Sequence, residues 1–219
     1  MQRIAVLGLG HFGFHVATTL HELGHEVIAL DSNREAVQNI MHRVTKAVVA
    51  DATERKVLEE LGLHEVNVAV VSFGTNFEAS VLATLYLHEL KVPRLVVKAV
   101  SEDQGRILLA IGASEVIHPE RDSAIKTAHR IASPNLVDYL PLAKDYGIIE
   151  LNTPHKFVGK TLVELQLRNR YEVQVLAIRS RSGGGAERFA PKANHELTDD
   201  DILVIMGPIR ELEALQKLD

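Results

Sequence analysis

Short apolar runs alternate with stretches of helical periodicity along the first half of the chain. The runs lie at residues 4–7, 27–30, 47–50, 68–71, 95–97 and 115–118, and they are rich in Val, Ile, Leu and Ala. Between the first two runs, Val16, Leu20 and Leu23 recur at helical spacing. Short β-branched strands that alternate with helices predict a parallel sheet covered on both faces, the doubly wound α/β architecture of a Rossmann domain.

The pattern changes after the sixth run. Residues 119–132 predict one helix, which ends at Ser133, Pro134 and Asn135. Further strands are predicted at 148–151, 173–178 and 202–206, with short helices at 161–166 and 209–218, a hairpin tip at 182–185 and a polar turn at 199–201. We therefore expect a Rossmann domain over residues 1–132, a hinge over 133–142 and a small α+β domain over 143–219.

Three expected helix starts show the capping-box pattern, in which a Ser or Thr pairs with an acid or amide three residues later. The pairs are Ser32 with Glu35, Thr75 with Glu78, and Ser101 with Gln104. Each pair can satisfy two backbone amides at a helix start, so these positions predict where helices begin.

The first 31 residues carry the most informative motif. The first apolar run passes directly into Gly8, Gly10 and Gly13, and a helix is expected to start near His11. Gly8 permits a tight turn out of the strand, and Gly10 lets the backbone approach a pyrophosphate. Gly13 allows the helix to pack closely on the strand. This order of strand, glycine turn, helix and strand predicts an adenine nucleotide bound at the turn.

An acid, Asp31, closes the second strand. Its carboxylate can accept both hydroxyls of an adenosine ribose, while the amides at the start of the helix suit a phosphate. Asp31 can equally serve only as a turn or helix cap, and the whole turn can be one that has lost its ligand.

Residues that follow the other strands are further candidates, because ligands bind beyond the carboxyl ends of parallel strands. These candidates are Asp51, Ala52, Thr53, Gly74, Asn76, Lys98 and Glu120. Asp51 and Thr53 can line the adenine or cap the next helix. Lys98 can meet a phosphate or be a solvated strand end. Glu120 can join a cation site or stabilise the dipole of its helix.

Composition narrows the class of protein. The chain is 46% hydrophobic and 24% charged, as expected of a globular protein, and it has no cysteine, which excludes disulfides and thiolate metal sites. The net charge of −5 argues against nucleic-acid binding. No apolar run approaches the roughly 20 residues that span a bilayer, and the start of the chain leads directly into a core strand. We expect a cytoplasmic protein.

The chain shows a nucleotide pocket without visible chemistry. His11 and His15 have a spacing that can bind a metal on a helix, yet no third ligand accompanies them, so the eleven histidines are expected to be scattered over the surface. No catalytic cluster, nucleophile elbow or Walker lysine motif accompanies the glycine turn. We therefore expect a sensor and not an enzyme, with a small NAD(P)-dependent oxidoreductase as the alternative.

The sequence resembles the RCK (regulator of potassium conductance) family, in particular the KtrA-type and TrkA-type cytoplasmic subunits of potassium uptake systems. The resemblance covers nearly the whole chain. It rests on I-A-V-L-G-L-G-H-F-G at 4–13, G-H-E-V-I-A-L-D at 24–31, A-D-A-T at 50–53, V-K-A at 97–99 and I-G-A-S-E-V-I-H-P-E-R-D at 111–122. In the second domain it rests on L-R-N-R-Y-E-V-Q-V-L-A-I at 167–178 and D-D-I-L-V-I-M-G at 200–207.

The resemblance implies roles for several of the candidates. The three glycines would hold the phosphates, with His11 and Phe12 in the same turn, and Asp31 would hold the ribose. Asp51 and Ala52 would border the adenine, and Lys98 would lie near the phosphates. Glu120 would match an acidic position associated with a divalent cation, Mg²⁺ or Ca²⁺. ATP and ADP are the expected ligands, with NAD(H) and AMP as further candidates and cyclic di-AMP in the second domain, where Arg168 and Pro191 are the residues of interest.

The resemblance also implies an assembly. Dimers would form an octameric ring at the inner face of the membrane, under a potassium-translocating subunit of the KtrB or TrkH kind. One position departs from the family, because many KtrA-like proteins carry Arg where this chain has His11. Histidine is shorter and mostly neutral at pH 7, so it cannot form a bidentate guanidinium clamp on a terminal phosphate.

Overall fold

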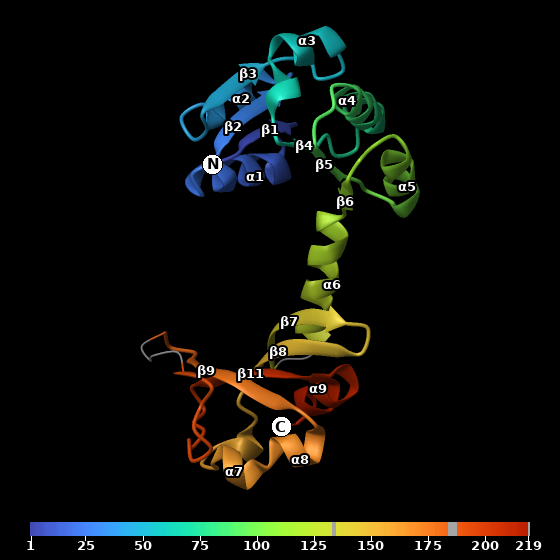
Figure 1. Cartoon of the computed structure of the whole chain (residues 1–219). Helices are drawn as coiled ribbons and strands as arrows, with labels where there is room; N and C mark the ends of the chain where they lie inside the picture. Colours follow the sequence, from blue (N-terminus) through green and yellow to red (C-terminus); the bar gives the residue numbers. More distant parts are fainter. Residues whose placement is uncertain (133–134, 184–187, 219) are drawn as a thin grey trace. The chain divides into compact units, whose positions relative to one another are not determined.

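The computed structural model describes residues 1–132, 135–183 and 188–218 (Figure 1). The chain divides into two compact units, Met1–Arg121 and a second unit that begins at Asp122. Within the described residues, no helix is both long and apolar enough to cross a membrane.

The first unit is built on a six-stranded parallel sheet in the order β3-β2-β1-β4-β5-β6. Its strands are β1 (Arg3–Leu7), β2 (Glu26–Asp31), β3 (Lys46–Val49), β4 (Val68–Val71), β5 (Arg94–Lys98) and β6 (Glu115–Ile117). The strand order reverses between β1 and β4, which is where a doubly wound sheet leaves a crevice at its carboxyl edge.

Helices cover both faces of this sheet. They are α1 (His11–Glu22), α2 (Arg34–Ile40), α3 (Arg55–Glu60), the 3-10 turn η1 (Leu63–Glu65), α4 (Phe77–Glu89) and α5 (Glu102–Ala110), and α6 (Pro119–Ala132) follows β6. Ile4 and Val6 of β1 share a core with Ala17 of α1 and with α2. Ala5 and Leu7 face the other way, into the core that α3, α4 and α5 complete. The predicted Rossmann fold is confirmed.

Two of the three predicted capping boxes are wrong. Asn33, not Ser32, begins α2, since its side-chain oxygen accepts hydrogen bonds from the Glu35 amide at 2.8 Å and the Ala36 amide at 3.3 Å. Asn76, not Thr75, begins α4, accepting from the Ala79 amide at 3.1 Å. In both cases an Asn one residue later supplies the cap.

The third cap forms as predicted, although its box is incomplete. Ser101 accepts a hydrogen bond from the Gln104 amide at 3.3 Å. The Gln104 side chain accepts from the amide of Val100 and not from that of Ser101.

The second unit holds an antiparallel sheet in the order β10-β9-β11-β8-β7. Its strands are β7 (Leu136–Ala143), β8 (Tyr146–Asn152), β9 (Gln174–Ser180), β10 (Arg188–Phe189) and β11 (Asp201–Pro208). Its helices are η2 (His155–Phe157), α7 (Leu162–Leu165), α8 (Leu167–Tyr171) and α9 (Ile209–Gln216). Leu212 and Leu215 of α9 pack into the sheet core. The expected small α+β domain is confirmed.

Two expectations about the second unit need comment. Strand β7 occupies most of the segment 133–142 that we expected to be a hinge, and it pairs with β8. The domain limits at 132 and 143 stay a prediction. The predicted hairpin tip at 182–185 falls partly outside the described residues, which exclude 184–187.

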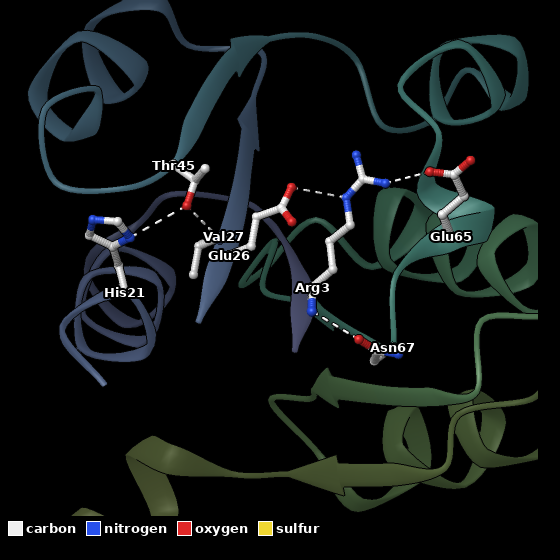
Figure 2. Close-up of polar contacts among 7 residues, drawn as sticks. All are labelled: Arg3, His21, Glu26, Val27, Thr45, Glu65 and Asn67. Atoms are coloured by element: carbon white, nitrogen blue, oxygen red, sulfur yellow. Dashed lines mark hydrogen bonds and ion pairs between the residues drawn. The ribbon is translucent and has the colours of Figure 1, made fainter. Parts of the chain in front are cut away.

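Polar contacts gather at the amino edge of the parallel sheet (Figure 2). The Arg3 guanidinium lies 3.1 Å from the Glu26 carboxylate and 2.5 Å from that of Glu65, and the Arg3 amide donates to the Asn67 side chain at 2.8 Å. The Thr45 hydroxyl accepts from the Val27 amide at 3.0 Å. The Arg3 contacts join β1 to β2 and to the segment that leads into β4, and the Thr45 contact joins β2 to the residue before β3, at the edge opposite the candidate site.

Candidate functional site

The three glycines of the turn after β1 serve different purposes. A Cβ on Gly8, whose φ is +92°, would lie 2.5 Å from the Ser72 carbonyl oxygen, and a Cβ on Gly13 would lie 1.9 Å from the Gly8 carbonyl oxygen. Packing within the chain therefore requires both. A Cβ on Gly10 would meet no atom of the described residues within 4 Å. The chain does not need glycine at this position, whereas a phosphate held against the backbone would.

Helix α1 presents free amides at the same turn. Its hydrogen-bond ladder begins with the Phe14 amide, which donates to the Gly10 carbonyl at 2.9 Å. The amides of His11, Phe12 and Gly13 precede that ladder. Gly10 has no side chain to cap them, and no acid lies in the first turn of α1. These amides and the helix dipole suit an anion next to Gly10.

Asp31 connects this turn to the end of β2. One carboxylate oxygen accepts a hydrogen bond from the Leu9 amide at 2.6 Å, and the other accepts from the Asn33 amide at 2.8 Å. The carboxylate therefore holds the glycine turn in place. Each oxygen keeps a second lone pair, so Asp31 can still accept a ribose hydroxyl.

A cavity of about 320 Å³ brings together residues from the ends of β2, β3 and β4. Its walls are Ser32, Ala50, Asp51, Ala52, Thr53, Phe73, Asn76, Glu78, Ala79 and Leu82. Four predicted site residues lie here: Asp51, Ala52, Thr53 and Asn76. The hydrogen bonds that Asp51 accepts from the Thr53 amide (2.9 Å) and hydroxyl (2.7 Å) lower the pKa of Asp51. The carboxylate stays charged at neutral pH.

Six lining residues were missed by the sequence reasoning: Ser32, Ala50, Phe73, Glu78, Ala79 and Leu82. Ser32 directly follows β2 and Phe73 lies two residues after the end of β4, so the strand-end rule that selected Asp51 could have found both. Glu78 lies in the first turn of α4, where a capping role explained it fully. The cavity thus offers an aromatic ring beside polar groups, a lining suited to a nucleobase and its sugar.

A second cavity, of about 510 Å³, lies between the starts of α1 and α2. Gly10, His11 and His15 line it from α1, and Asn33 and Glu35 line it from α2. His11 therefore faces this groove beside the turn. Within the described residues, no cluster of three His, Cys, Asp or Glu side chains is arranged to hold a metal ion.

Gly74 adopts a left-handed conformation with φ of +60°, and a Cβ there would meet no atom within 4 Å. The backbone conformation explains this glycine. Gly74 is not part of the cavity lining, and its role in binding stays a prediction.

Lys98 ends β5 next to the glycine turn. It is 8% exposed, its ammonium lies 5.8 Å from the centre of the Phe12 ring, and it donates a hydrogen bond to Glu120 at the start of α6. This bond lowers the pKa of Glu120. Lys98 is thus a buried, paired cation and not a solvated strand end. In this structure the Glu120 carboxylate is paired with Lys98. The metal role of Glu120 stays a prediction.

Comparison with known proteins shows the family to which the chain belongs. Residues 4–119 match the TrkA-N domain family and residues 147–218 match the TrkA-C domain family. The chain is 35% identical to Ktr system potassium uptake protein C of Bacillus subtilis, over 99% of this chain and 96% of that protein. It is 36% identical to Ktr system potassium uptake protein A of the same organism, over 98% and 96%. The chain belongs to the Ktr and Trk potassium uptake family.

A solved structure shows the same fold. The GsuK channel bound to NAD superposes on this family member with a TM-score of 0.66 at 18% identity. The match covers 99% of this chain and 39% of the channel chain, so the Ktr/Trk protein corresponds to about two-fifths of the channel. The predicted resemblance is confirmed by the family matches over both halves of the chain.

Proposed function

We propose that this protein is the nucleotide-sensing regulatory subunit of a Ktr/Trk-type potassium transporter. It binds an adenine nucleotide at the Gly8–Gly13 turn and controls potassium flux through a membrane-embedded partner. One observation carries the proposal: a Cβ on Gly10 would meet no described atom within 4 Å, at the uncapped start of α1 and next to Leu9, whose amide donates to Asp31. The relatives named as potassium uptake proteins support the transport role.

ATP and ADP are the proposed ligands. The phosphates would lie against Gly10 and the α1 amides, the ribose on Asp31, and the adenine in the cavity beside Phe73. The NAD-bound GsuK channel, which has this fold, supports NAD(H) as another candidate. His11 lines the groove beside the turn and lacks the reach of arginine, so AMP also stays a candidate.

Among the described residues, Glu120 is the acid that we propose for a divalent cation. Its carboxylate is the one acid beside Lys98 for which a contact is described, so it would supply a single ligand to Mg²⁺ or Ca²⁺, and the phosphates would supply others.

A second ligand is proposed for the C-terminal unit. A groove of about 390 Å³ there is lined by Leu162, Val163, Arg168 and Pro191, among others. The groove unites Arg168 and Pro191, the two residues that we associated with cyclic di-AMP. A guanidinium at an apolar groove is suited to a phosphate-bearing ligand.

We propose a regulatory and not a catalytic role. Dimers would assemble into an octameric ring at the inner face of the membrane. Each nucleotide would shift the ring toward the conformation that it binds more tightly, by an amount set by the ratio of its affinities for the two conformations. The alternative, a small NAD(P)-dependent oxidoreductase, predicts hydride transfer from NADH or NADPH to simple carbonyl compounds.

Calorimetric titration with ATP, ADP, AMP, NADH and cyclic di-AMP, with light scattering to follow assembly, tests the proposal. We expect ATP and ADP to bind and to differ in their effect on the assembly. Asp31→Ala should abolish nucleotide binding in a protein that remains folded but melts earlier, because two amides lose their acceptor. Asp103→Ala, in an exposed carboxylate on α5, is the matched control. Unchanged affinity in Asp31→Ala would refute the assignment of the pocket.

A further inference from the structure

Among the described residues, Lys98 is the one charged residue that is buried, and its ammonium lies 5.8 Å from the centre of the Phe12 ring in the glycine turn. It is 8% exposed, and its described counter-charge is the Glu120 carboxylate, whose side chain is 68% exposed. An ammonium withdrawn from water needs an anion beside it. The exposed carboxylate can return to water at little cost, whereas the buried ammonium cannot.

The position of the pair relates it to the bound ligand. The Lys98 ammonium also lies over the Phe12 ring, and Phe12 belongs to the first turn of α1, whose amides face the phosphate position. A phosphate on those amides would therefore be a second anion near the same ammonium. Glu120 carries one negative charge, whereas the terminal phosphate of ADP or ATP carries up to two near neutral pH.

We propose that Glu120 is a specificity-determining residue of the nucleotide site: its carboxylate competes with the ligand phosphate for the Lys98 ammonium. A doubly charged terminal phosphate attracts the Lys98 ammonium more strongly than the Glu120 carboxylate does and can replace it as the partner of Lys98. The linking phosphates of a dinucleotide carry one charge each, as Glu120 does, so replacing Glu120 with them brings little electrostatic energy. Because Glu120 begins α6, the exchange also releases the start of that helix from the end of β5. This inference rests on the proposed nucleotide site.

Glu120→Gln tests the competition. The amide keeps the size of the side chain but removes its charge, so Lys98 becomes available to the ligand. We expect calorimetry in EDTA, which keeps divalent cations from bridging the ligand to Glu120, to show about fivefold tighter binding of ADP. In Lys98→Met, ADP should bind more weakly than to the unmodified protein, and adding Glu120→Gln should then bring no gain.

Glu102→Gln is the matched control. The Glu102 carboxylate on α5 forms an ion pair with Arg121, which follows Glu120 in α6, and its described partner is not Lys98. This variant should leave ADP affinity unchanged, and thermal melts of all variants would verify folding. Binding of ADP that Glu120→Gln leaves unchanged or weakens would overturn the competition while leaving the proposed function intact. Failure of the unmodified protein to bind any nucleotide would instead reject the proposed function, and this inference with it.

Discussion

Replacing Gly10 with alanine separates the needs of the fold from those of the ligand. The backbone of Gly10 (φ −62°, ψ −177°) is open to any residue, and the new Cβ would meet no atom within 4 Å. Restricting the unfolded chain stabilises such a variant by about 0.4–1 kcal/mol. Alanine is a poorer helix N-cap than glycine by roughly 0.5 kcal/mol, which offsets most of that gain. We expect a melting temperature within about 2 °C of the unmodified protein.

Nucleotide binding should respond very differently. The Cβ of Gly10→Ala occupies the space proposed for a phosphate, so the Kd for ADP should rise more than about tenfold, equivalent to 1.4 kcal/mol. Gly13→Ala is the contrasting variant, because its Cβ would lie 1.9 Å from the Gly8 carbonyl oxygen and should destabilise the fold by about 1–3 kcal/mol or more. Calorimetry and thermal melts on both variants decide the matter. A stable Gly10→Ala protein with unchanged ADP affinity would refute the placement of the phosphates.

Two further predictions concern the frame of the site. Arg3→Met should lower the free energy of unfolding by no more than about 1 kcal/mol, because the ion pairs of Arg3 with Glu26 and Glu65 are partly exposed. The variant should leave ADP affinity unchanged. A large loss of ADP affinity would show that the two edges of the sheet are coupled. The lowered pKa of Asp51 contributes stability that is present above its unfolded pKa of about 3.8 and is lost as the pH falls through the lower folded value. Thr53→Val should move the pKa of Asp51 back toward its usual value in an NMR titration of the carboxyl carbon, and an unmoved pKa would contradict the role given to Thr53.

The sequence predicted the sheet well because its central strands β2, β1 and β4 are largely buried. Runs such as 68–71 are apolar on both faces and match β4 as observed. Strand β7 was missed because Pro141 and the polar Asp138 interrupt its apolar pattern, and its pairing with β8 depends on residues close in space and not on local signals. The two mistaken caps have a local cause, since Ser32 and Thr75 each precede an Asn whose side chain accepts from amides at the helix start.

The candidate site was predictable where backbone geometry defines it and less so where side chains meet. Strand ends predicted that Asp51 and Asn76 would converge, and they line one cavity. The partnership of Lys98 with Glu120 was not predicted, because each residue had an adequate explanation alone. Only the structure shows that the ammonium is buried and paired.

The unequal roles of the turn residues have an evolutionary consequence. In a descendant that no longer binds any ligand, selection for folding alone would retain Gly8 and Gly13, which the backbone needs, and Asp31, which holds two amides. Gly10 would be free to change, since no described atom lies within 4 Å of a Cβ there. Among related sequences, the middle glycine is therefore the position whose loss would mark a subunit without the proposed nucleotide site.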